Sequence, residues 1–474
     1  MPTLQADYLV IGAGAVGMAF VDTIVAESDA TVVMVDRAHQ PGGHWTVAYP
    51  FVRLHQPSAY YGVNSRTLGS GRLDNNGWNA GLYELAGVDE IRAYYDAVMR
   101  DLLDSGQVTY FPLSEYRGER AFATVSGEEY GVEVLRRVVD TTHSGVVVPS
   151  MRRPEFDVEP GIACVPPNDL PRYARDRDRF VIVGGGKTGM DSALWLLRNG
   201  IGPERLTWIV PRESWLLDRA NIQPGPDFAD RLKAAFAART RAATEATSVE
   251  DLFARLEAAG ALLRLHSDVT PTMYRCATVT QAEADQLRRI ADVVRLGHVQ
   301  RIDHNGAMLD GGVLPAGTNT LWIDCSAGGL TGGPDTAVFD GERLTPQCVR
   351  ACQQVFSAAF IAHVELSYDD DAVKNALCEP VPLPNRPRDW LIMSMIEQRN
   401  QVRWFSEPAL MDWLDTSRLN AIRELFAPVM SRPRIRERAL GAMTSVLQAA
   451  GEKMAALLAS ESSAYDDAAA MANR

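Results

Sequence analysis

The strongest constraint on the fold of this chain is a glycine pattern that occurs twice. Residues 7–17 read as an apolar, β-prone run followed by Gly-x-Gly-x-x-Gly, and residues 179–189 repeat the arrangement. A helical stretch follows each loop. In this pattern the first glycine permits a tight turn, the second lets the backbone approach a pyrophosphate, and the third lets the helix pack on the strand. N–H groups at the helix N-terminus then bind the phosphates. The repeat predicts an α/β fold with two Rossmann-like domains and two bound dinucleotides.

Length, charge and hydropathy limit the class of protein. The 474 residues are enough for two or three domains with their own cores, and the net charge of -13 argues against nucleic acid or an anionic membrane as a partner. No apolar stretch is long enough to span a bilayer, and the apolar N-terminal run lacks a preceding basic segment. We therefore expect a cytoplasmic protein with no membrane partner. The sequence does not decide its oligomeric state.

The cysteines do not form a recognisable site in the sequence. None is spaced as Cys-x-x-Cys, and no His/Cys spacing typical of zinc occurs, so we expect no metal. We interpret the cysteines as buried thiols in a cytosolic protein. The six are Cys164, Cys276, Cys325, Cys348, Cys352 and Cys378.

An acidic residue follows the first loop at the distance that suits a ribose. Residues 31–35 form a second β-prone run, and Asp36 comes directly after it. At this position a carboxylate accepts hydrogen bonds from both ribose hydroxyls and repels a 2′-phosphate, which favours FAD or NAD over NADP. A Pro-Gly-Gly-His-Trp segment at 41–45 comes next. The candidate contacts to this first nucleotide are Gly12, Gly14, Ala15, Val16, Gly17, Asp36, Arg37, Gly43, His44, Trp45 and Gln56.

The second loop is followed by a base instead of an acid. The β-prone run that starts at residue 206 leads to Arg212, whose guanidinium suits a 2′-phosphate, and Ser214 could add a donor. This difference favours NADPH over NADH. A P-loop is excluded, because that motif needs a glycine where Val181 stands; Lys187 is then either a cation near the pyrophosphate or a solvated lysine. The candidate contacts are Gly184, Gly186, Lys187, Thr188, Gly189, Arg212 and Ser214.

Together the two loops, Asp36, the Gly-Gly-x-Trp segment and Arg212 resemble the class B flavoprotein monooxygenases, which include flavin-containing and N-hydroxylating enzymes. The resemblance covers about residues 5–365. Near residues 156–169 the chain departs from the signature of this family in spacing and lacks its histidine, which indicates a divergent branch.

The resemblance implies FAD and NADPH as cofactors, with molecular oxygen and a small organic molecule as substrates. It implies a C4a-(hydro)peroxyflavin as the oxygenating species. It also places residues 52–58 close to the flavin, so that Arg53 and His55 become the candidate catalytic residues.

Other functions stay open. An NADPH-dependent flavoprotein reductase could pass electrons to a ferredoxin or a quinone, and nothing in the sequence excludes it. A flavin disulfide reductase usually needs a cysteine pair spaced as Cys-x-x-Cys or Cys-x-x-x-x-Cys, and neither spacing occurs in the sequence. A third possibility is a binding module that keeps the cofactor without turnover.

The remaining patterns predict the domain order. We expect a FAD-binding part at 1–172, an NADPH-binding domain at 173–325 with a helical insertion near 221–280, a second FAD-binding part with a cap at 326–430, and a helical tail at 431–474. Four aromatic residues in the C-terminal region either line a substrate pocket or fill a core: Trp390, Trp404, Phe405 and Trp413. Segments predicted individually are helices at 89–104 and 352–364, strands at 108–111, 130–135, 137–140 and 320–324, a connector at 149–171, and a hairpin at 299–314.

Overall fold

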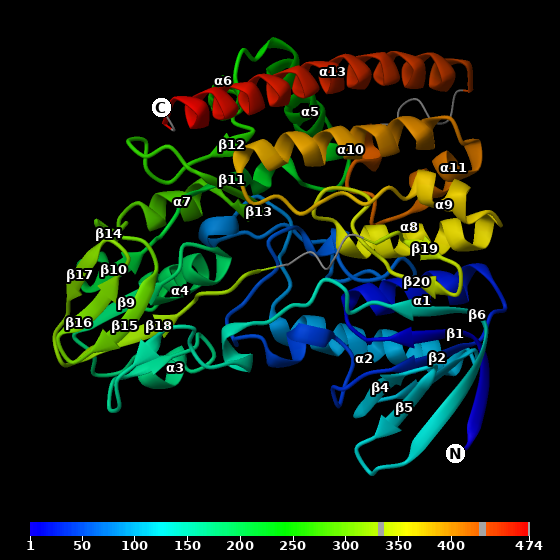
Figure 1. The fold of residues 1–474 in the computed structure, drawn as a ribbon, viewed down its shortest axis with the longest axis horizontal. Helices are drawn as coiled ribbons and strands as arrows, with labels where there is room; N and C mark the ends of the chain where they lie inside the picture. The colour runs from blue at the N-terminus through cyan, green and yellow to red at the C-terminus, as the bar shows by residue number, and fades with distance from the viewer. Residues whose placement is uncertain (330–335, 426–432, 473–474) are drawn as a thin grey trace.

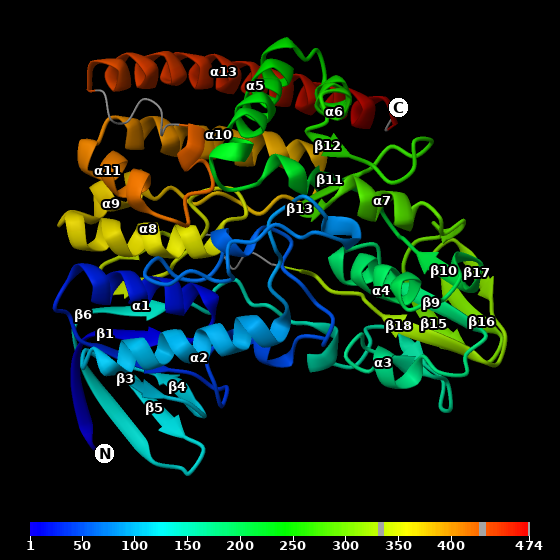
Figure 2. The same cartoon turned by 180° about the vertical axis from the view of Figure 1, so that it is seen from behind.

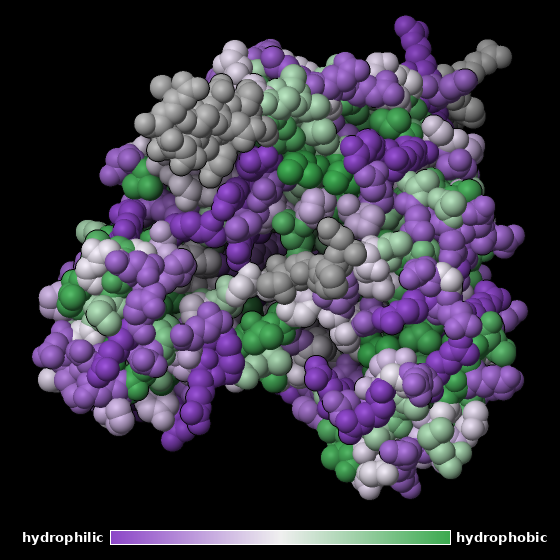
Figure 3. Space-filling view, in the orientation of Figure 1, coloured by the Kyte–Doolittle hydropathy of each residue, from purple (hydrophilic) through white to green (hydrophobic). Residues whose placement is uncertain are grey.

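Two α/β units lie side by side under a layer of helices. The computed structural model describes the backbone of residues 1–329, 336–425 and 433–472, with the side chains of these residues except 433–434 and 462–472. The first unit lies at the lower right of Figure 1, the second at the lower left, and the C-terminal helices lie above both. In the space-filling view of Figure 3 a notch separates the two lower lobes at the edge of the molecule.

The first unit contains a sheet with strand order β19-β20-β6-β1-β2-β3, which is parallel except for the antiparallel pair β19 and β20, and β4 and β5 attach to it as an antiparallel meander. β1 pairs in parallel with both β2 and β6. The strands of this unit are β1 (Thr3–Ile11), β2 (Val32–Val35), β3 (Val108–Phe111), β4 (Ser114–Gly118), β5 (Ala121–Thr124), β6 (Glu129–Asp140), β19 (Phe339–Asp340) and β20 (Arg343–Leu344).

Side chains alternate across this sheet, so its two faces have different covers. Tyr8 and Val10 face a core shared with helices α1 (Ala15–Glu27), α2 (Val88–Asp104) and α8 (Gln354–Ser367). Leu9, between them, faces the meander and contacts a cluster that contains Phe122. Both faces are therefore buried, which explains why β1 reads as an almost continuous apolar run.

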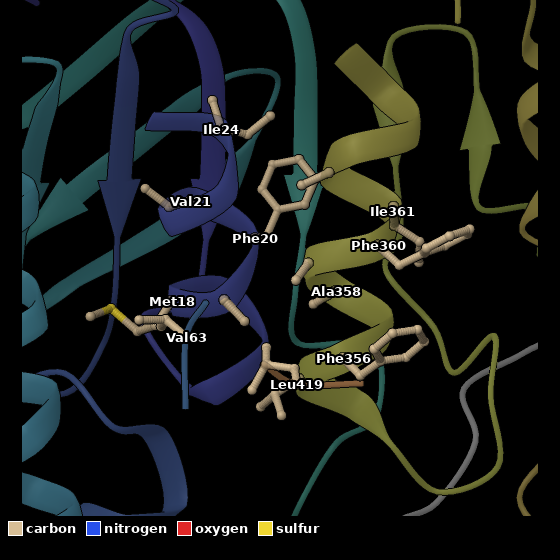
Figure 4. Packing of buried hydrophobic residues seen from close by; sticks show 14 of the residues in the cluster. Met18, Phe20, Val21, Ile24, Val63, Phe356, Ala358, Phe360, Ile361 and Leu419 are labelled. Atoms are coloured by element: carbon tan, nitrogen blue, oxygen red, sulfur yellow. The ribbon is translucent and has the colours of Figure 1, made fainter. Parts of the chain in front are cut away.

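Helices α1 and α8 run side by side although more than 300 residues separate them, and both are buried along most of their length. In Figure 4 Met18 of α1 lies level with Ala358 near the start of α8, and Ile24 lies toward the opposite end. The two helices are thus parallel, and their N-terminal ends point toward the same side of the unit.

The second unit repeats this design. Its parallel sheet has the order β14-β10-β9-β18-β8, one face packs on helices α4 and α7, and the other packs on a sheet of β7, β15, β16 and β17. The elements are β7 (Asp157–Val158), β8 (Cys164–Val165), α3 (Leu170–Tyr173), β9 (Arg179–Val183), α4 (Lys187–Arg198), β10 (Leu206–Ile209), α7 (Gln281–Leu287), β14 (Asp292–Val294), β15 (Val299–Asp303), β16 (Gly306–Leu309), β17 (Gly312–Pro315) and β18 (Thr320–Asp324).

The layer above the two units combines the insertion with the C-terminal helices. Figure 2 shows α5 and α6 of the insertion against α10 and α13, and α5 packs directly on α13. The elements are β11 (Ser214–Asp218), α5 (Ala229–Glu245), α6 (Val249–Ala258), β12 (Leu262–Leu263), β13 (Met273–Val279), α9 (Asp371–Leu377), α10 (Pro387–Phe405), α11 (Pro408–Thr416) and α13 (Pro433–Ala472). Among the described residues, no helix is both long and apolar enough to cross a membrane.

Most elements predicted from the sequence occur in the structure, with four differences. Residues 130–140 form one strand, β6, and residues 308–314 contain a turn between β16 and β17. The expected connector at 149–171 adds β7 and β8 to the second unit. The insertion holds the sheet β12-β11-β13 besides its helices. These strands are short and gain their partners only from tertiary pairing, so local patterns do not reveal them. The predicted boundary at 430/431 lies outside the described residues.

The expectation that all cysteines are buried thiols is wrong for two of them. Cys276 of β13 and Cys352, which precedes α8, form a disulfide across a sequence separation of 76 residues. Cys164, Cys325, Cys348 and Cys378 are free thiols. The spacing of the cysteines in the sequence does not indicate this pair, because only the tertiary fold brings the two segments together.

Candidate functional site

The first glycine loop lies between the end of β1 and the start of α1. Gly12 has φ +102°, and a Cβ at Gly17 would overlap the carbonyl oxygen of Gly12. Helix α1 therefore packs on the loop as closely as backbone allows. Gly14 caps α1 without any side-chain hydrogen bond, so the first N–H groups of the helix, at Ala15 and Val16, are left to bind an anion.

Asp36 stands beside this loop at the end of β2. Its carboxylate accepts the backbone N–H of Ala13 at 2.5 Å and that of Ala38 at 2.6 Å. The neighbouring Arg37 is exposed. Tyr110 of β3 has a buried hydroxyl without a hydrogen-bond partner among the described residues; burial, and then the charges of Asp36 and Asp96, raise its pKa. An adenosine ribose placed at Asp36 would offer the hydroxyl groups that this donor and these carboxylate oxygens can bind.

The segment 42–45 closes over the loop. Gly42 and Gly43 both have positive φ, and a Cβ on Gly43 would lie 3.0 Å from Cα of Gly14. The His44 ring lies tilted against that of Trp45 with ring centroids 5.0 Å apart, and burial lowers the pKa of His44 to about 4. Trp45 Nε1 donates to the Tyr61 hydroxyl at 2.7 Å. The glycines thus leave a narrow backbone cradle, and the aromatic rings form its wall.

The second glycine loop has the same form. Gly184 has φ +120°, and a Cβ there would lie 2.9 Å from the carbonyl oxygen of Cys325, in the turn that follows β18. A Cβ at Gly189 would overlap the Gly184 carbonyl oxygen. Gly186 caps α4 without a side-chain bond and faces open space. The carbonyl of Thr188, in the first turn of α4, accepts the Ser192 hydroxyl.

The structure brings Lys187 of the second loop to Arg53 and His55 of the first unit. Lys187 Nζ forms an ion pair with Asp191 and lies 3.5 Å from the Arg53 carbonyl oxygen. Asp191 also accepts the Tyr49 hydroxyl at 2.6 Å. Burial, followed by the charges of Lys187 and Arg219, lowers the pKa of His55 well below its usual value. The imidazole is therefore neutral near pH 7.

Arg219 fixes this junction and was not predicted from the sequence. Its side chain is 1% exposed, and Nε donates to the His55 carbonyl oxygen at 2.7 Å. Its Nη1 lies 2.9 Å from Glu283 and 3.1 Å from the Asn79 amide oxygen. An arginine directly after β11 and outside any motif carries no local signal for such a role. Gln56 is held locally, since Nε2 donates to the Tyr60 carbonyl oxygen at 3.4 Å.

Polar side chains gather where β10 leads into β11. Arg212 donates to the side-chain oxygen of Asn385 at 3.0 Å. Ser214 is buried, and its hydroxyl donates to the Trp215 carbonyl oxygen. Between them Glu213 is buried and accepts from Arg295 Nε at 2.8 Å, while its Oε2 has no partner among the described residues. Glu213, Ser214 and Gly185 line a cavity about the size of one water molecule.

Comparison with known proteins relates the whole chain to bacterial relatives. An uncharacterized protein of Mycobacterium tuberculosis (strain ATCC 25618 / H37Rv) is 56% identical over 457 residues, which cover 96% of this chain and 85% of that protein. The chain belongs to the family of that protein. An uncharacterized protein of Mycobacterium bovis (strain ATCC BAA-935 / AF2122/97) gives the same values for this family. No family model matches the chain.

A solved structure shares the fold. The open crystal structure of cyclohexanone monooxygenase superposes with a TM-score of 0.50 at 13% sequence identity, covering 79% of this chain and 88% of that one. The predicted fold class is therefore confirmed, and so is the resemblance of the fold to that of a class B flavoprotein monooxygenase.

The C-terminal aromatic residues do not form one pocket. Trp404 and Phe405 line a water-sized cavity with Arg350, whose pKa burial lowers to about 10. Trp390 belongs to a separate core cluster below α13, and Trp413 stacks on His363. These residues act mainly as core, which was one of the two interpretations left open by the sequence.

Proposed function

We propose that the protein is a FAD-dependent, NADPH-using monooxygenase that oxygenates a small organic substrate. The observation that carries the proposal is the meeting of the two glycine-loop units at Lys187, Asp191 and Tyr49, with Arg53 and His55 between the loops. Two dinucleotides bound in this way would direct their reactive ends toward one junction. The shared fold supports this arrangement.

The residues of the first unit fit FAD. The pyrophosphate would lie on the uncapped start of α1, the adenosine ribose on Asp36, and the chain toward the ring along the backbone cradle of Gly14 and Gly43. The N-terminus of the parallel helix α8 adds a second positive dipole end on the same side. The chemistry supplied by bound FAD is acceptance of hydride from NADPH and activation of oxygen.

The second unit fits NADPH. Its pyrophosphate would lie on the uncapped start of α4, where Gly186 faces open space. Arg212 has no carboxylate partner among the described residues and can bind a 2′-phosphate by charge-assisted hydrogen bonds. Lys187, paired with Asp191, is directed to the first unit and would hold the two units in a fixed relative position.

The first experiment is to follow NADPH oxidation by the FAD-loaded protein with and without air, with an assay for hydrogen peroxide. We expect NADPH to bleach the flavin without air, and air to restore its colour with release of peroxide when no substrate is present. Anaerobic bleaching alone fits both functions, whereas fast electron transfer to a quinone or ferredoxin in place of a reaction with oxygen would contradict the proposal and indicate the reductase.

A variant of His55 tests the candidate catalytic residue. As a neutral imidazole it can donate one hydrogen bond toward the flavin region, so we expect His55→Ala to raise about tenfold the rate at which the NADPH-reduced protein releases peroxide in air without substrate. Because burial keeps the pKa of His55 well below its usual value, this rate should not change between about pH 7 and 8 in the parent protein. His304→Ala, an exposed histidine in the turn between β15 and β16, is the control. Equal rates of peroxide release from the two variants would show that His55 takes no part in the reaction.

The disulfide favours a second candidate, a flavin-linked disulfide reductase. Cys352 lies just before the N-terminus of α8, on the same side as the first glycine loop. Counting thiols after anaerobic NADPH addition separates the two functions. The monooxygenase keeps four free thiols, whereas the reductase exposes all six.

A further inference from the structure

Two arginines from distant segments converge on one amide oxygen. Oδ1 of Asn385 accepts Arg212 Nη2 and Arg275 Nε, each at 3.0 Å. Asn385 itself is fixed just before α10, because its N–H donates to Asp389 at 3.0 Å and its carbonyl oxygen accepts the Tyr274 N–H. Arg275 comes from β13 of the insertion and was not among the residues predicted from the sequence.

This pair of positive charges has no ion-pair partner among the described residues. In the part of the chain that the structure describes, no carboxylate forms an ion pair with Arg212 or Arg275. Arg275 instead donates to Asn385 and to the Gly328 carbonyl oxygen. Burial, and next the charge of Arg212, lower the pKa of Arg275. A bound phosphate would relieve the repulsion and accept from both planar guanidiniums.

A β-bulge directs Arg275 toward this position. The pairing of β11 with β13 goes from Trp215 opposite Tyr274 to Leu217 opposite Thr278, so Leu216 alone stands opposite Arg275, Cys276 and Ala277. Cys276 has φ +55°, in the left-handed region. Bulges of this kind turn side chains out of the ladder next to binding sites.

The disulfide secures the same bulge. It joins Cys276, the residue after Arg275, to Cys352 in the turn before α8. It thereby ties the strand that carries Arg275 to the first unit, whereas Arg212 belongs to the second unit. Without this bond, the described contacts that hold the bulge are those with β11, Asn385 and the Gly328 carbonyl oxygen.

We propose that Arg275 binds the 2′-phosphate of NADPH together with Arg212, and that the disulfide Cys276–Cys352 holds Arg275 in place, so that a dithiol weakens NADPH binding. The proposal rests on the second nucleotide being NADPH. A thiolate of the dithiol attacks one sulfur, the S–S bond breaks and a mixed disulfide forms. The second thiol of the reagent then displaces the protein sulfur; the protein gains two thiols and the dithiol becomes a cyclic disulfide.

Equilibrium binding of NADP⁺ and NAD⁺ to the FAD-loaded protein tests the role of Arg275. We expect Arg275→Gln to weaken NADP⁺ binding about 10- to 100-fold and to leave NAD⁺ binding within about twofold, as expected for one lost charge-assisted contact. Arg289→Gln is the matched control, an exposed arginine of the second unit whose side chain donates to Gln286. Equal losses for the two nucleotides, or no loss, would overturn the assignment.

The same assay with dithiothreitol tests the disulfide. Reduction should raise the thiol count from four to six and weaken NADP⁺ binding about tenfold, and reoxidation should restore it. The double variant Cys276→Ser, Cys352→Ser should bind NADP⁺ like the reduced protein and ignore dithiothreitol, whereas Cys164→Ser should respond like the parent. If six thiols appear without a change in NADP⁺ binding, the coupling is wrong.

Binding of oxidised nucleotides needs no turnover. A protein that binds NADP⁺ through Arg275 but never oxidises NADPH would therefore refute the proposed function and leave this inference standing.

Discussion

A purified Gly17→Ala variant is expected to be colourless. A Cβ at this position would overlap the carbonyl oxygen of Gly12 and meet Oγ1 of Thr141 at 3.0 Å. Since both neighbours belong to the rigid end of the sheet, α1 has to move away from β1 and takes its phosphate-binding N–H groups with it. We expect FAD affinity to fall by about 100-fold, which corresponds to about 2.8 kcal/mol. The flavin absorbance per chain after gel filtration measures the loss.

Gly189→Ala is the matched control, because its Cβ would overlap the Gly184 carbonyl oxygen in the corresponding loop. This variant should keep its FAD and lose flavin reduction by NADPH. Retention of FAD by Gly17→Ala, or equal loss of FAD from both variants, would show that the first loop is not the FAD site.

An Arg137→Met variant is expected to lose about 3–5 kcal/mol in free energy of unfolding. Arg137 of β6 lies under α8 and α9, where Nε contacts Glu365 at 3.0 Å and Nη2 contacts Asp371 at 2.5 Å. Lys374 Nζ completes the cluster at 2.6 Å from Glu365. The side chains of Glu365 and Lys374 are 5% and 4% exposed, so removing Arg137 leaves Lys374 alone against two carboxylates and the buried cluster with a net negative charge. Urea unfolding followed by circular dichroism measures the change.

The adjacent Arg136 supplies the control. Its side chain is 48% exposed and pairs with Asp7 at 3.4 Å, so Arg136→Met should cost at most about 1 kcal/mol. The cluster also sets a pH dependence. Hydrogen bonding to Arg137 lowers the pKa of Asp371, so its contribution is present above the unfolded-state value of about 3.9 and disappears as the pH falls through the lower folded-state value. Similar midpoints for the two variants would show that the cluster adds no stability.

The sequence predicts the parts of this site that are local. Gly12, Gly17 and Asp36 lie within one strand–loop–helix–strand run, so spacing alone places a ribose acid beside a phosphate loop. The second loop and Arg212 follow from the same reasoning. The aromatic residues of the C-terminal region carry no such pattern, and the structure was needed to separate Trp404 beside a cavity from Trp390 in a core.

The residues that sequence reasoning missed act across long separations. Arg219 holds the carbonyl of His55, 164 residues away, and Arg275 meets Asn385 across 110 residues. Tyr110 reaches the neighbourhood of Asp36 only because β3 pairs in parallel with β2. No periodicity or short motif predicts such long-range contacts, since each contact depends on how the sheets and the insertion pack.

The division of the first unit along the chain sets an order of assembly on the ribosome. The sheet of the second unit, from β8 to β18, is drawn from one uninterrupted stretch of chain, so it can form while synthesis continues. The first unit cannot complete its fold until β20, which pairs with β6, and α8, which covers α1, have been synthesised. A nascent chain that ends before Gln354 exposes the apolar side of α1 to solvent. If the first unit binds FAD as proposed, flavin binding is thus a late step that follows folding of the second unit.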